Sequence, residues 1–585
     1  MIKKNLQTLG LKVLHSMQIK YFIPILILHL SFSLSGQTPE YVSPVKIPVF
    51  LSGNFAELRS NHFHSGIDIK TQGITGIPIY SAASGFISRI VVSPTGYGLA
   101  LYIEHPNGTT SVYGHLESFR DDIARYVKSK QYEQESFRVD LPVSKSLFPV
   151  KQDEFIAKSG NTGSTGGPHL HFEIRDTKTE EPVNPLFYPF PVADKIAPHI
   201  YSLMITPMNE FAHVNYQAQK AIFPVEFSEG KFRLKNNPVV PVYGVVGFAV
   251  QANDFYDGSH NRCGIYSMRM FWDGELYFSF RMDRFSFDES RYINSHIDYE
   301  ELINTKQWFH KAWQDPGNRL SIYDYIRDSG LLRVTDGNIH IVRIELSDLH
   351  GNLSILEFRV ESKSHRIVPI RTEYTQLLRY DKANRFSEEN ITIDFSENTF
   401  YNDVEFMWKQ KPASENLFSD IHVIHQNTVP LHNSAKLSIK ADKLEKELQE
   451  KALLVTVDTL TGKISSAGGS YNKGFVTANI RSFGNYAIAL DTIAPRIIPL
   501  SLNDKSALTE FNRIRFRITD DLSGIKEYTG ILDGKWALFE YDAKTNMIVH
   551  YFDRERFELE KRHQLTVKVT DNKGNENIHE TSFWK

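Results

Sequence analysis

The most regular pattern of apolar and polar positions lies in residues 160–175, GNTGSTGGPHLHFEIR. From position 169 onward the two classes alternate strictly, as they do on a strand that has one face on a core. Both imidazoles, His169 and His171, then point the same way. Two neighbouring imidazoles suit a metal ligand beside a group that moves protons, but a surface strand that happens to carry two histidines fits this pattern equally well.

Short apolar stretches follow one another between residues 76 and 116, separated by Gly, Pro and an Asn-Gly pair at 107–108. Such punctuation is typical of antiparallel strands, and Asn-Gly is typical of a hairpin turn. Residues 119–132 instead show the spacing of an amphipathic helix, which either walls one side of a cleft or forms a plain surface excursion. A second helix is predicted over 441–453.

The glycine-rich stretch at 160–167 is not interpreted as a phosphate-binding loop. It lacks the GK[ST] ending and leads into a strand rather than a helix. Its glycines favour a sharp turn or a close approach of the backbone to another chain.

A repeat organises the C-terminal two thirds of the chain. Residues 194–207 (DKIAPHIYSLMITP) resemble residues 491–504 (DTIAPRIIPLSLND), and each begins a segment that ends in a D-x-x-G-N turn between alternating stretches. Such a turn is typical of the closing hairpin of an Ig-like sandwich. We therefore predict two Ig-like domains, the first with a partly helical insertion around 280–335.

Candidate metal ligands stand upstream of the alternating strand. In NHFHSGIDIK, His64 precedes Asp68 by four residues, and Gly66 favours an extended chain on which both share a face. Imidazole nitrogen and carboxylate oxygen are zinc ligands, and one histidine from His169 or His171 would make three. Three protein ligands leave a position open for water, as in a catalytic zinc site. Spacing alone does not choose between the two histidines.

Three further residues lie near these positions. His115, in SVYGHLES, is expected after a strand and a turn. Glu173 shares the predicted face of the alternating strand and either orients a ligand histidine or is a solvated or salt-bridged strand glutamate. His62 could replace His64, but the spacing to Asp68 favours His64.

Taken together, HxxxD at 64–68, YGHL at 113–116 and GPHLHF at 167–172 resemble the M23 (LytM/lysostaphin-type) zinc metallopeptidases in residues and in order. The resemblance covers roughly residues 50–190. It implies one Zn²⁺ per chain and assigns the ligands and the two catalytic residues. The implied ligands are His64, Asp68 and His171, and the implied catalytic pair is His115 and His169.

The resemblance also implies an activity, the hydrolysis of peptide bonds in the stem or cross-bridge peptides of peptidoglycan. No HExxH glutamate is present, so proton transfer falls to His115 and His169, whose ordinary pKa of about 6.5 suits both directions. The alternatives are a non-catalytic LytM-like regulator of other cell-wall hydrolases, a peptidase of non-wall peptides, and an adhesion protein with a vestigial peptidase fold. The complete set of ligands favours the enzyme over the regulator.

The predicted fold class is mainly β, with an N-terminal antiparallel β metallopeptidase domain followed by β-sandwich (Ig-like) domains. The C-terminal domains are expected to position the peptidase on the wall or on cell-envelope proteins. The predicted divisions are a signal peptide (1–36), the peptidase domain (37–192), an Ig-like domain with an insertion (193–362), a β-rich domain (363–490) and an Ig-like sandwich (491–585).

Amino-acid composition and the N-terminal segment indicate the class of protein, its partners and its location. A hydrophobic share of 41% fits a globular protein, and a net charge of −3 without a dense basic run disfavours nucleic acid as a partner. Lysines precede an apolar stretch at 21–34 that is too short to span a bilayer, so we predict a cleaved signal peptide starting at Met1 or Met17, and an exported protein of the periplasm or cell surface with no stable membrane span.

The remaining cysteine and histidines are expected to be structural. Cys263 is the single cysteine, which excludes an internal disulfide and favours a small buried side chain. The later histidines show no ligand spacing and are interpreted as ordinary core or surface residues. They are His260, His296, His310, His340 and His350.

Overall fold

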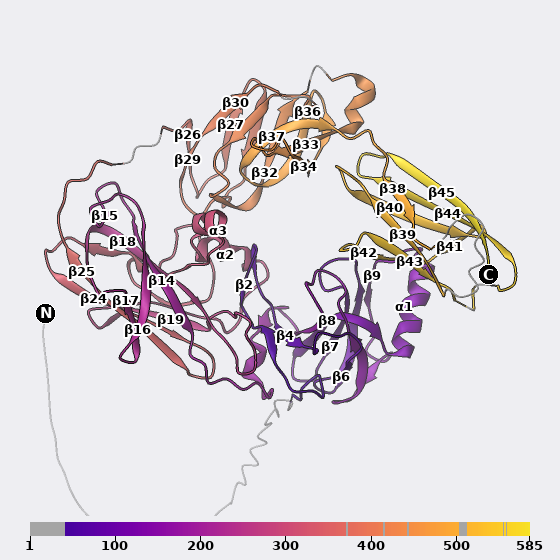
Figure 1. The fold of residues 1–585 in the computed structure, drawn as a ribbon, viewed down its shortest axis with the longest axis horizontal. Coiled ribbons are helices and arrows are strands. Elements are labelled where there is room, and N and C mark those ends of the chain that lie inside the picture. The colour runs from indigo at the N-terminus through magenta and orange to yellow at the C-terminus, as the bar shows by residue number, and fades with distance from the viewer. Residues whose placement is uncertain are drawn as a thin grey trace, which may run out of the picture. The chain divides into compact units, whose positions relative to one another are not determined.

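Strands predominate in the computed structural model of the protein, as the sequence predicts (Figure 1). The predicted signal peptide lies outside the described residues. Among the described helices, none has the length and apolar character needed to cross a membrane. The structure describes residues 41–369, 373–413, 416–441, 444–501, 512–553, 555–556 and 558–585.

The N-terminal domain (residues 37–192) is built on one eleven-stranded sheet. Its path runs β1 (Leu51–Gly53), β4 (Ile67–Lys70), β12 (His169–Asp176), β8 (Thr109–Phe119), β7 (Leu99–Glu104), β6 (Gly85–Val92) and β10 (Pro149–Val150). Four strands pair at its margins: β5 (Pro78–Tyr80), β9 (Val139–Pro142), β11 (Phe155–Ser159) and β13 (Pro182–Val183). A separate small hairpin joins β2 (Leu58–Arg59) and β3 (His62–Phe63).

The strand predicted from strict alternation is β12, which lies between β4 and β8. Its apolar residues Leu170, Phe172 and Ile174 are fully buried and belong to the core of this domain. Because side chains alternate along a strand, the two histidines of β12 are directed to the opposite face. The hairpin predicted at Asn107-Gly108 joins β7 to β8.

The helix predicted at 119–132 is α1 (Asp121–Glu133). Ile123 and Val127 on its inner face are buried in the core of the N-terminal domain, and the helix contacts β8 and β9. The amphipathic pattern therefore corresponds to a helix that packs against the core of the N-terminal domain. Its predicted role as a wall of a cleft stays a prediction.

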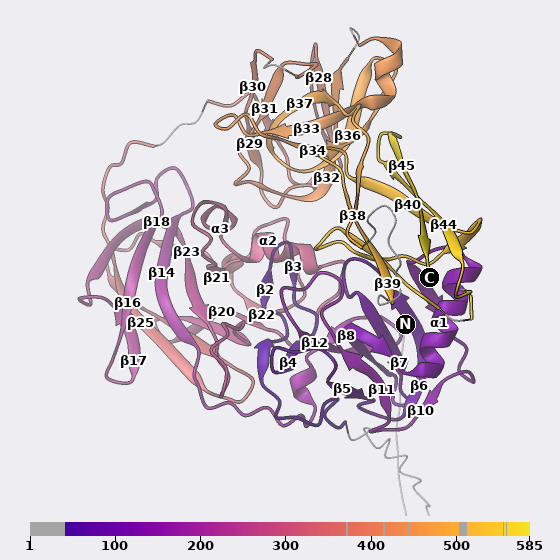
Figure 2. The ribbon, with the colours of Figure 1, turned by 45° about the vertical axis from the view of Figure 1, so that its right-hand side comes forward.

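The second domain (residues 193–362) contains twelve hydrogen-bonded strands, several of which lie side by side in Figure 2. Their path runs β15 (His213–Val214), β18 (Val239–Asn253), β14 (His199–Pro207), β16 (Ala221–Ser228), β17 (Lys231–Leu234), β25 (Leu353–Ser362), β24 (Ile339–Ser347), β19 (Ser267–Trp272), β20 (Glu275–Arg281) and β22 (Tyr323–Ile326), with β21 (His310–Lys311) and β23 (Leu332–Val334) paired to β18. The predicted insertion is partly helical, with α2 (Ile293–His296) and α3 (Tyr299–Thr305).

The third domain (residues 363–490) contains two five-stranded sheets and a small pair, β26 (Gln376–Leu378) with β29 (Val404–Phe406). One sheet orders β27 (Asn384–Glu388), β28 (Ile391–Phe395), β32 (Pro430–Lys440), β36 (Phe475–Ser482) and β35 (Ser470–Asn472). The other orders β30 (Trp408–Lys411), β31 (Ile421–Ile424), β37 (Gly484–Leu490), β33 (Ala452–Val457) and β34 (Ile464–Gly468).

The α-helix predicted at 441–453 is wrong. The described part of this stretch contains a 3₁₀ helix, η4 (Lys446–Lys451), and β33 begins directly after it. The apolar residues Leu453 and Leu454 are both fully buried, as on a strand covered on both faces. A short apolar run of this kind does not distinguish a strand from a helix by its period.

The C-terminal domain (residues 491–585) has two four-stranded sheets. They order β38 (Arg496–Pro499), β39 (Arg513–Thr519), β43 (Met547–Tyr551) and β42 (Glu540–Asp542) in one, and β41 (Lys535–Ala537), β40 (Ile525–Leu532), β44 (Arg562–Asp571) and β45 (Glu576–Trp584) in the other. Phe516 and Val567, one from each sheet, share a single core, so the sheets form a sandwich. The Ig-like assignment stays a prediction.

Both D-x-x-G-N motifs form the turns that the sequence predicts. Residues 348–352 join β24 to β25, and residues 571–575 join β44 to β45.

The first two domains share part of their cores, because Phe55 and Phe63 of the N-terminal domain pack with core residues of the second. The described chain from Tyr41 onward falls into one compact unit, so the domain boundaries stay predictions.

Candidate metal centre

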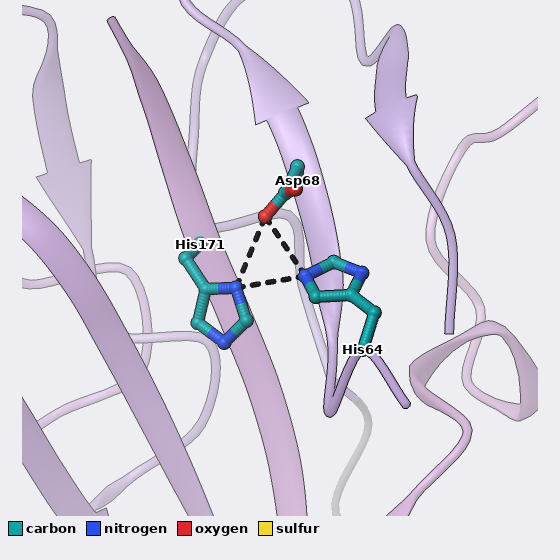
Figure 3. A group of neighbouring side chains, drawn as sticks. All are labelled: His64, Asp68 and His171. Carbon is teal, nitrogen blue, oxygen red and sulfur yellow. Dashed lines mark hydrogen bonds and ion pairs between the residues drawn. The ribbon is translucent and has the colours of Figure 1, made fainter. Parts of the chain in front are cut away.

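Three donor atoms from the predicted ligand residues converge in the N-terminal domain (Figure 3). His64 Nε2, Asp68 Oδ1 and His171 Nδ1 lie 3.0 Å from one another in each of the three pairs. All three residues are buried, with exposed fractions of 7%, 6% and 4%. The sequence places two of them more than a hundred residues from the third, and the sheet brings them together.

Strand pairing explains how two of these residues meet. In the antiparallel pair β4–β12, His171 stands directly opposite Asp68. On the other side of β12, His171 stands opposite Gly114 of β8. The central position of β12 therefore fixes His171 between the two strands that carry the other motifs.

The expectation that His64 and Asp68 share one strand is wrong. β3 ends at Phe63 and β4 begins at Ile67, so His64 lies in the connection between them. Gly66 permits this path, because a Cβ there would lie 2.3 Å from the carbonyl oxygen of Phe172. His64 reaches Asp68 across a turn instead of along a strand.

Hydrogen bonds orient both imidazoles toward the shared point. His64 Nδ1 donates to the carbonyl oxygen of Asn54 at 2.7 Å, which leaves the lone pair of Nε2 facing the cluster. His171 Nε2 donates to Glu173 Oε1 at 2.7 Å, which directs Nδ1 to the shared point as the atom that can bind a metal. Partners of this kind commonly fix the tautomer of a metal-ligating histidine.

Glu173 combines two of the roles that the sequence leaves open. Its side chain is fully buried, so it is not solvated, and it is both salt-bridged to Arg175 and bonded to His171. It accepts hydrogen bonds from His171 and, at 2.6 Å, from Arg175 Nε. Burial opposes ionisation, but Arg175 and His171 outweigh it and hold the pKa of Glu173 well below its ordinary value. A negative charge therefore stands behind His171.

The charge balance of the cluster favours a cation. Burial lowers the pKa of His64. Burial also opposes the charge of Asp68, but the neighbouring His64 and the hydrogen bonds from His169 and His171 hold its pKa well below the ordinary value. Burial disfavours charge on His171 as well, yet hydrogen bonds to Asp68 and Glu173 raise its pKa to about 9. Two carboxylates thus draw positive charge to this point.

The donor set fits zinc. Zinc–nitrogen and zinc–oxygen bonds of about 2.0–2.1 Å in a tetrahedron put the donor atoms about 3.3 Å apart, close to the spacing found here. Two imidazoles and one carboxylate are three protein ligands, the number that leaves a fourth position for water. Arg59 Nη2 lies 3.0 Å from Asp68 Oδ2 and holds the carboxylate by its other oxygen.

The two predicted catalytic histidines lie beside the cluster. The ring centroid of His115 lies 4.8 Å from that of His169 and 5.8 Å from that of His171. His169 Nε2 lies 3.3 Å from Asp68 Oδ1. All five residues assigned by resemblance are therefore within one site.

The backbone at His115 departs from the expected strand and turn. His115 lies within β8 with a φ of 59°, a left-handed conformation that is uncommon for a residue with a Cβ. Its N–H donates to the carbonyl oxygen of Tyr97, and its Nδ1 donates to the carbonyl oxygen of Thr162 at 2.8 Å. Such strain is typical of functional sites, where the surroundings hold the conformation.

The glycine-rich loop brings Thr162 to His115. Gly163 has a φ of 73°, and a Cβ there would lie 2.3 Å from Gly96 O and Gly98 N. The loop therefore packs backbone against backbone on the turn between β6 and β7 of the same chain. The predicted approach to another chain stays a prediction.

Comparison with known families decides where this domain belongs. Residues 62–132, which include His64, Asp68 and His115, match the model described as peptidase family M23. The chain contains an M23 peptidase domain. The matched segment ends before His169 and His171, which β12 adds to the same site. A second match, to the model of a Zu5-like domain, covers residues 375–491.

Curated relatives resemble the chain around the M23 domain. The DD-carboxypeptidase/endopeptidase Mpg of Neisseria meningitidis serogroup B is 31% identical over 145 residues, which are 24% of this chain and 27% of that protein. The peptidoglycan DD-endopeptidase ShyB of Vibrio cholerae is 29% identical over 160 residues, which are 27% of this chain and 31% of that protein. The chain thus spans less than a third of the length of these relatives.

Solved structures similar to part of this chain include two peptidases. A zinc-containing peptidase from Vibrio cholerae is 27% identical and covers 25% of this chain and 38% of its own, with a TM-score of 0.19. The catalytic domain of lysostaphin from Staphylococcus simulans is 20% identical and covers 24% of this chain and 90% of its own, with a TM-score of 0.18.

The structure also places the cysteine and the other histidines that the sequence singles out. His62 is exposed and bonds the carbonyl oxygen of Ser60, outside the cluster. Cys263 is buried, as predicted, and burial raises the pKa of its thiol. The prediction that the later histidines are ordinary core or surface residues stays a prediction. His350 is exposed and lies with Asp194 and Asp348 in a group whose ligand atoms are within 4.8 Å of one another.

Proposed function

We propose that the chain is a zinc-dependent endopeptidase that hydrolyses peptide bonds in peptidoglycan stem or cross-bridge peptides. The observation that carries the proposal is the convergence of His64, Asp68 and His171 at 3.0 Å within an M23 domain, with two further histidines alongside. His64 Nε2, Asp68 Oδ1 and His171 Nδ1 would hold the metal. When bound, zinc supplies a Lewis acid that activates water and polarises a scissile carbonyl.

His115 is suited to accept a proton. Its Nδ1 donates to Thr162 O, so the lone pair of its Nε2 remains available. Burial, with the neighbouring His171 and His169, lowers the pKa of His115 to about 3, and the ring is neutral at physiological pH. We assign His115 to the removal of the proton from the attacking water.

His169 then takes the second role. Its Nδ1 donates to the carbonyl oxygen of Gly167 at 2.9 Å, and its Nε2 lies 3.3 Å from Asp68 Oδ1. We assign His169 to the stabilisation of the oxyanion and the protonation of the leaving amine.

The substrate class rests on the named relatives. Mpg is described as a DD-carboxypeptidase/endopeptidase and ShyB as a peptidoglycan DD-endopeptidase. We extend that class to this chain and propose that it acts in the periplasm or at the cell surface after export. The C-terminal domains would position the M23 domain on the wall or on envelope proteins. A non-catalytic regulator is disfavoured because the ligand set is complete.

The test compares residues 37–585 with two histidine variants. The wild-type chain should hold about one zinc and release new muropeptide ends from purified peptidoglycan, and His171→Ala should lose both. His62→Ala is the matched control, because His62 is exposed and lies two residues from a proposed ligand. Zinc without cleavage would reject the wall substrate, and the absence of both from the wild type would reject the enzyme.

A further inference from the structure

The repeated motifs of the second and C-terminal domains bring acidic side chains together at equivalent places. In the second domain, Asp194 precedes β14, Asp254 directly follows β18, and Asp348 directly follows β24. Carboxylate oxygens of Asp194 and Asp348 belong to the group within 4.8 Å that includes His350. Asp254 lies near enough that both carboxylates raise its pKa. None of these residues takes part in the M23 site.

The motifs build the same frame in both domains. Asn352 Nδ2 donates to Asp194 O and to Asp348 Oδ2. In the C-terminal domain, Asn575 Nδ2 donates to Asp491 O and to Asp571 Oδ2. The third acidic residue there is Asp520, which directly follows β39 and completes a group within 4.8 Å. The acidic residues therefore stand at equivalent chain positions in the two domains. In the second domain the group within 4.8 Å consists of Asp194, Asp348 and His350, and Asp254 lies beside it.

The two triads differ in how their charges are satisfied. In the C-terminal domain, Asp520 Oδ2 accepts from the backbone N–H groups of Leu522 and Gly524, and Asp491 Oδ2 accepts from that of Ser523. The positive charge of Lys573 interacts with Asp491 and Asp571 as well. Lys573 Nζ donates to the carbonyl oxygens of Ala452 and Gly469, and its charge acts on the triad from that position. This triad has its hydrogen-bond donors within the chain.

The second-domain triad is satisfied only in part. Asp194 Oδ1 accepts from the backbone N–H of Ile196, and Asp348 accepts from the backbone and side-chain N–H groups of Asn352. Asp254 is 1% exposed, and neither of its carboxylate oxygens has a hydrogen-bond partner among the described residues; the adjacent N–H of Phe255 favours ionisation without regular hydrogen-bond geometry. Asp194 Oδ2 is buried and unpartnered too. The position equivalent to Lys573 is His350, whose Nδ1 lies 3.6 Å from Asp194 Oδ2.

Buried carboxylates without hydrogen-bond partners require a compensating positive charge or donor, because an unpaired buried charge is strongly destabilising. Burial, with Asp194 and Asp348, raises the pKa of Asp254 to about 9, and burial with Asp348 raises that of Asp194 to about 7. A cation between them would remove the repulsion. Clustered carboxylate oxygens are the ligands that calcium prefers.

We propose that the second domain binds one calcium ion between Asp194, Asp254 and Asp348. The ion supplies positive charge directly to these carboxylates, and it ties the entry to β14, the end of β18 and the β24–β25 turn together. The site is structural, and its occupancy does not depend on the peptidase activity.

The test uses zinc-loaded protein of residues 37–585 in calcium-free buffer. Titration calorimetry should show about one calcium per chain, and calcium should raise the midpoint of thermal unfolding by several degrees. Asp254→Asn should abolish both effects, and the matched change Asp520→Asn in the C-terminal triad should leave both intact.

A further variant separates calcium binding from failure to fold. Asp254→Asn removes a buried carboxylate, so in calcium-free buffer its unfolding midpoint should equal or exceed that of the wild type. His350→Lys imitates the C-terminal triad and should lose calcium binding while gaining calcium-independent stability. The proposal is overturned if the wild type binds no calcium, if Asp254→Asn binds as much, or if this site takes a second zinc in place of calcium.

Discussion

At the scale of single residues, Glu173 orients the proposed ligand His171. It is fully buried, it accepts the Nε2 proton of His171, and it is paired with Arg175. We expect Glu173→Gln to weaken zinc binding by about 10–100-fold, because the carboxylate that fixes the tautomer of His171 is lost. Competition with a chromophoric chelator measures this affinity.

The control for that change is Glu180→Gln. Glu180 contacts the same arginine, with its Oε2 3.3 Å from Arg175 Nη1, but it does not contact His171. Zinc affinity should stay at the wild-type value. An equal loss in both variants would show that Arg175, and not the bond to His171, governs the site.

Two histidines of the second domain predict a pH dependence of stability. His296 Nε2 lies 3.2 Å from His310 Nδ1, and both side chains are buried. Burial lowers the pKa of His310 to about 4 and, together with His310, lowers that of His296 well below its ordinary value. Below about pH 6.5 the unfolded chain binds protons that the folded chain does not.

The free energy of unfolding should therefore fall as the pH is lowered from about 6.5 to about 4, by up to about 1.4 kcal/mol per pH unit for each group. Urea unfolding at a series of pH values measures the slope. His310→Asn should flatten it. An unchanged slope in this variant would assign the acid sensitivity to other groups.

At the scale of elements, the pairing of β4 with β12 creates the site. Gly66 lets the chain turn against β12, since a Cβ would lie 2.3 Å from Phe172 O. Gly66→Ala should cost about 1–3 kcal/mol in the free energy of unfolding and lower zinc content, because the backbone must move next to His64. Gly166→Ala is the control, because a Cβ there meets nothing within 4 Å.

The same elements show how much of the structure could be predicted from the sequence. The period of two along 169–174 predicts β12 and its buried face, and the three motifs with their family resemblance select five residues that the structure brings together. The path through His64 could not be predicted, because it depends on the approach of Gly66 to a strand a hundred residues away. The left-handed His115 is likewise held by contacts to Tyr97 and Thr162, distant in sequence.

The sequence also could not predict which acidic side chains are buried without hydrogen-bond partners. The repeat of D-x-x-G-N predicts two hairpins, and both are present. A turn motif does not reveal that Asp254, from another strand end, stands unpartnered beside Asp348 in one domain. Nor does it reveal that backbone donors satisfy Asp520 in the other.

At the scale of the whole molecule, the second domain supports the metal centre. Asn54, whose carbonyl oxygen orients His64, donates from Nδ2 to Gly264 O and accepts from Gly264 N, each at 2.8 Å. Phe63 packs in the core of the second domain, and its N–H donates to Ser290 Oγ. The segment that carries the first ligand is thus held from both sides.

We therefore expect residues 37–192 alone to bind zinc poorly, and residues 37–362 to bind it as the full chain does. In the shorter chain Phe55 and Phe63 lose the core that buries them, which costs about 1.5–3 kcal/mol for each side chain. Asn54 also loses its partner Gly264, so His64 is no longer held in place. Zinc content and thermal unfolding of the two chains are the measurements that test this prediction.

A substitution in the full chain tests the same contact. We expect Asn54→Ala to weaken zinc binding without unfolding the protein. A shorter chain that binds zinc with full affinity would show that the N-terminal domain orders His64 by itself, and Asn54→Ala would then have no effect.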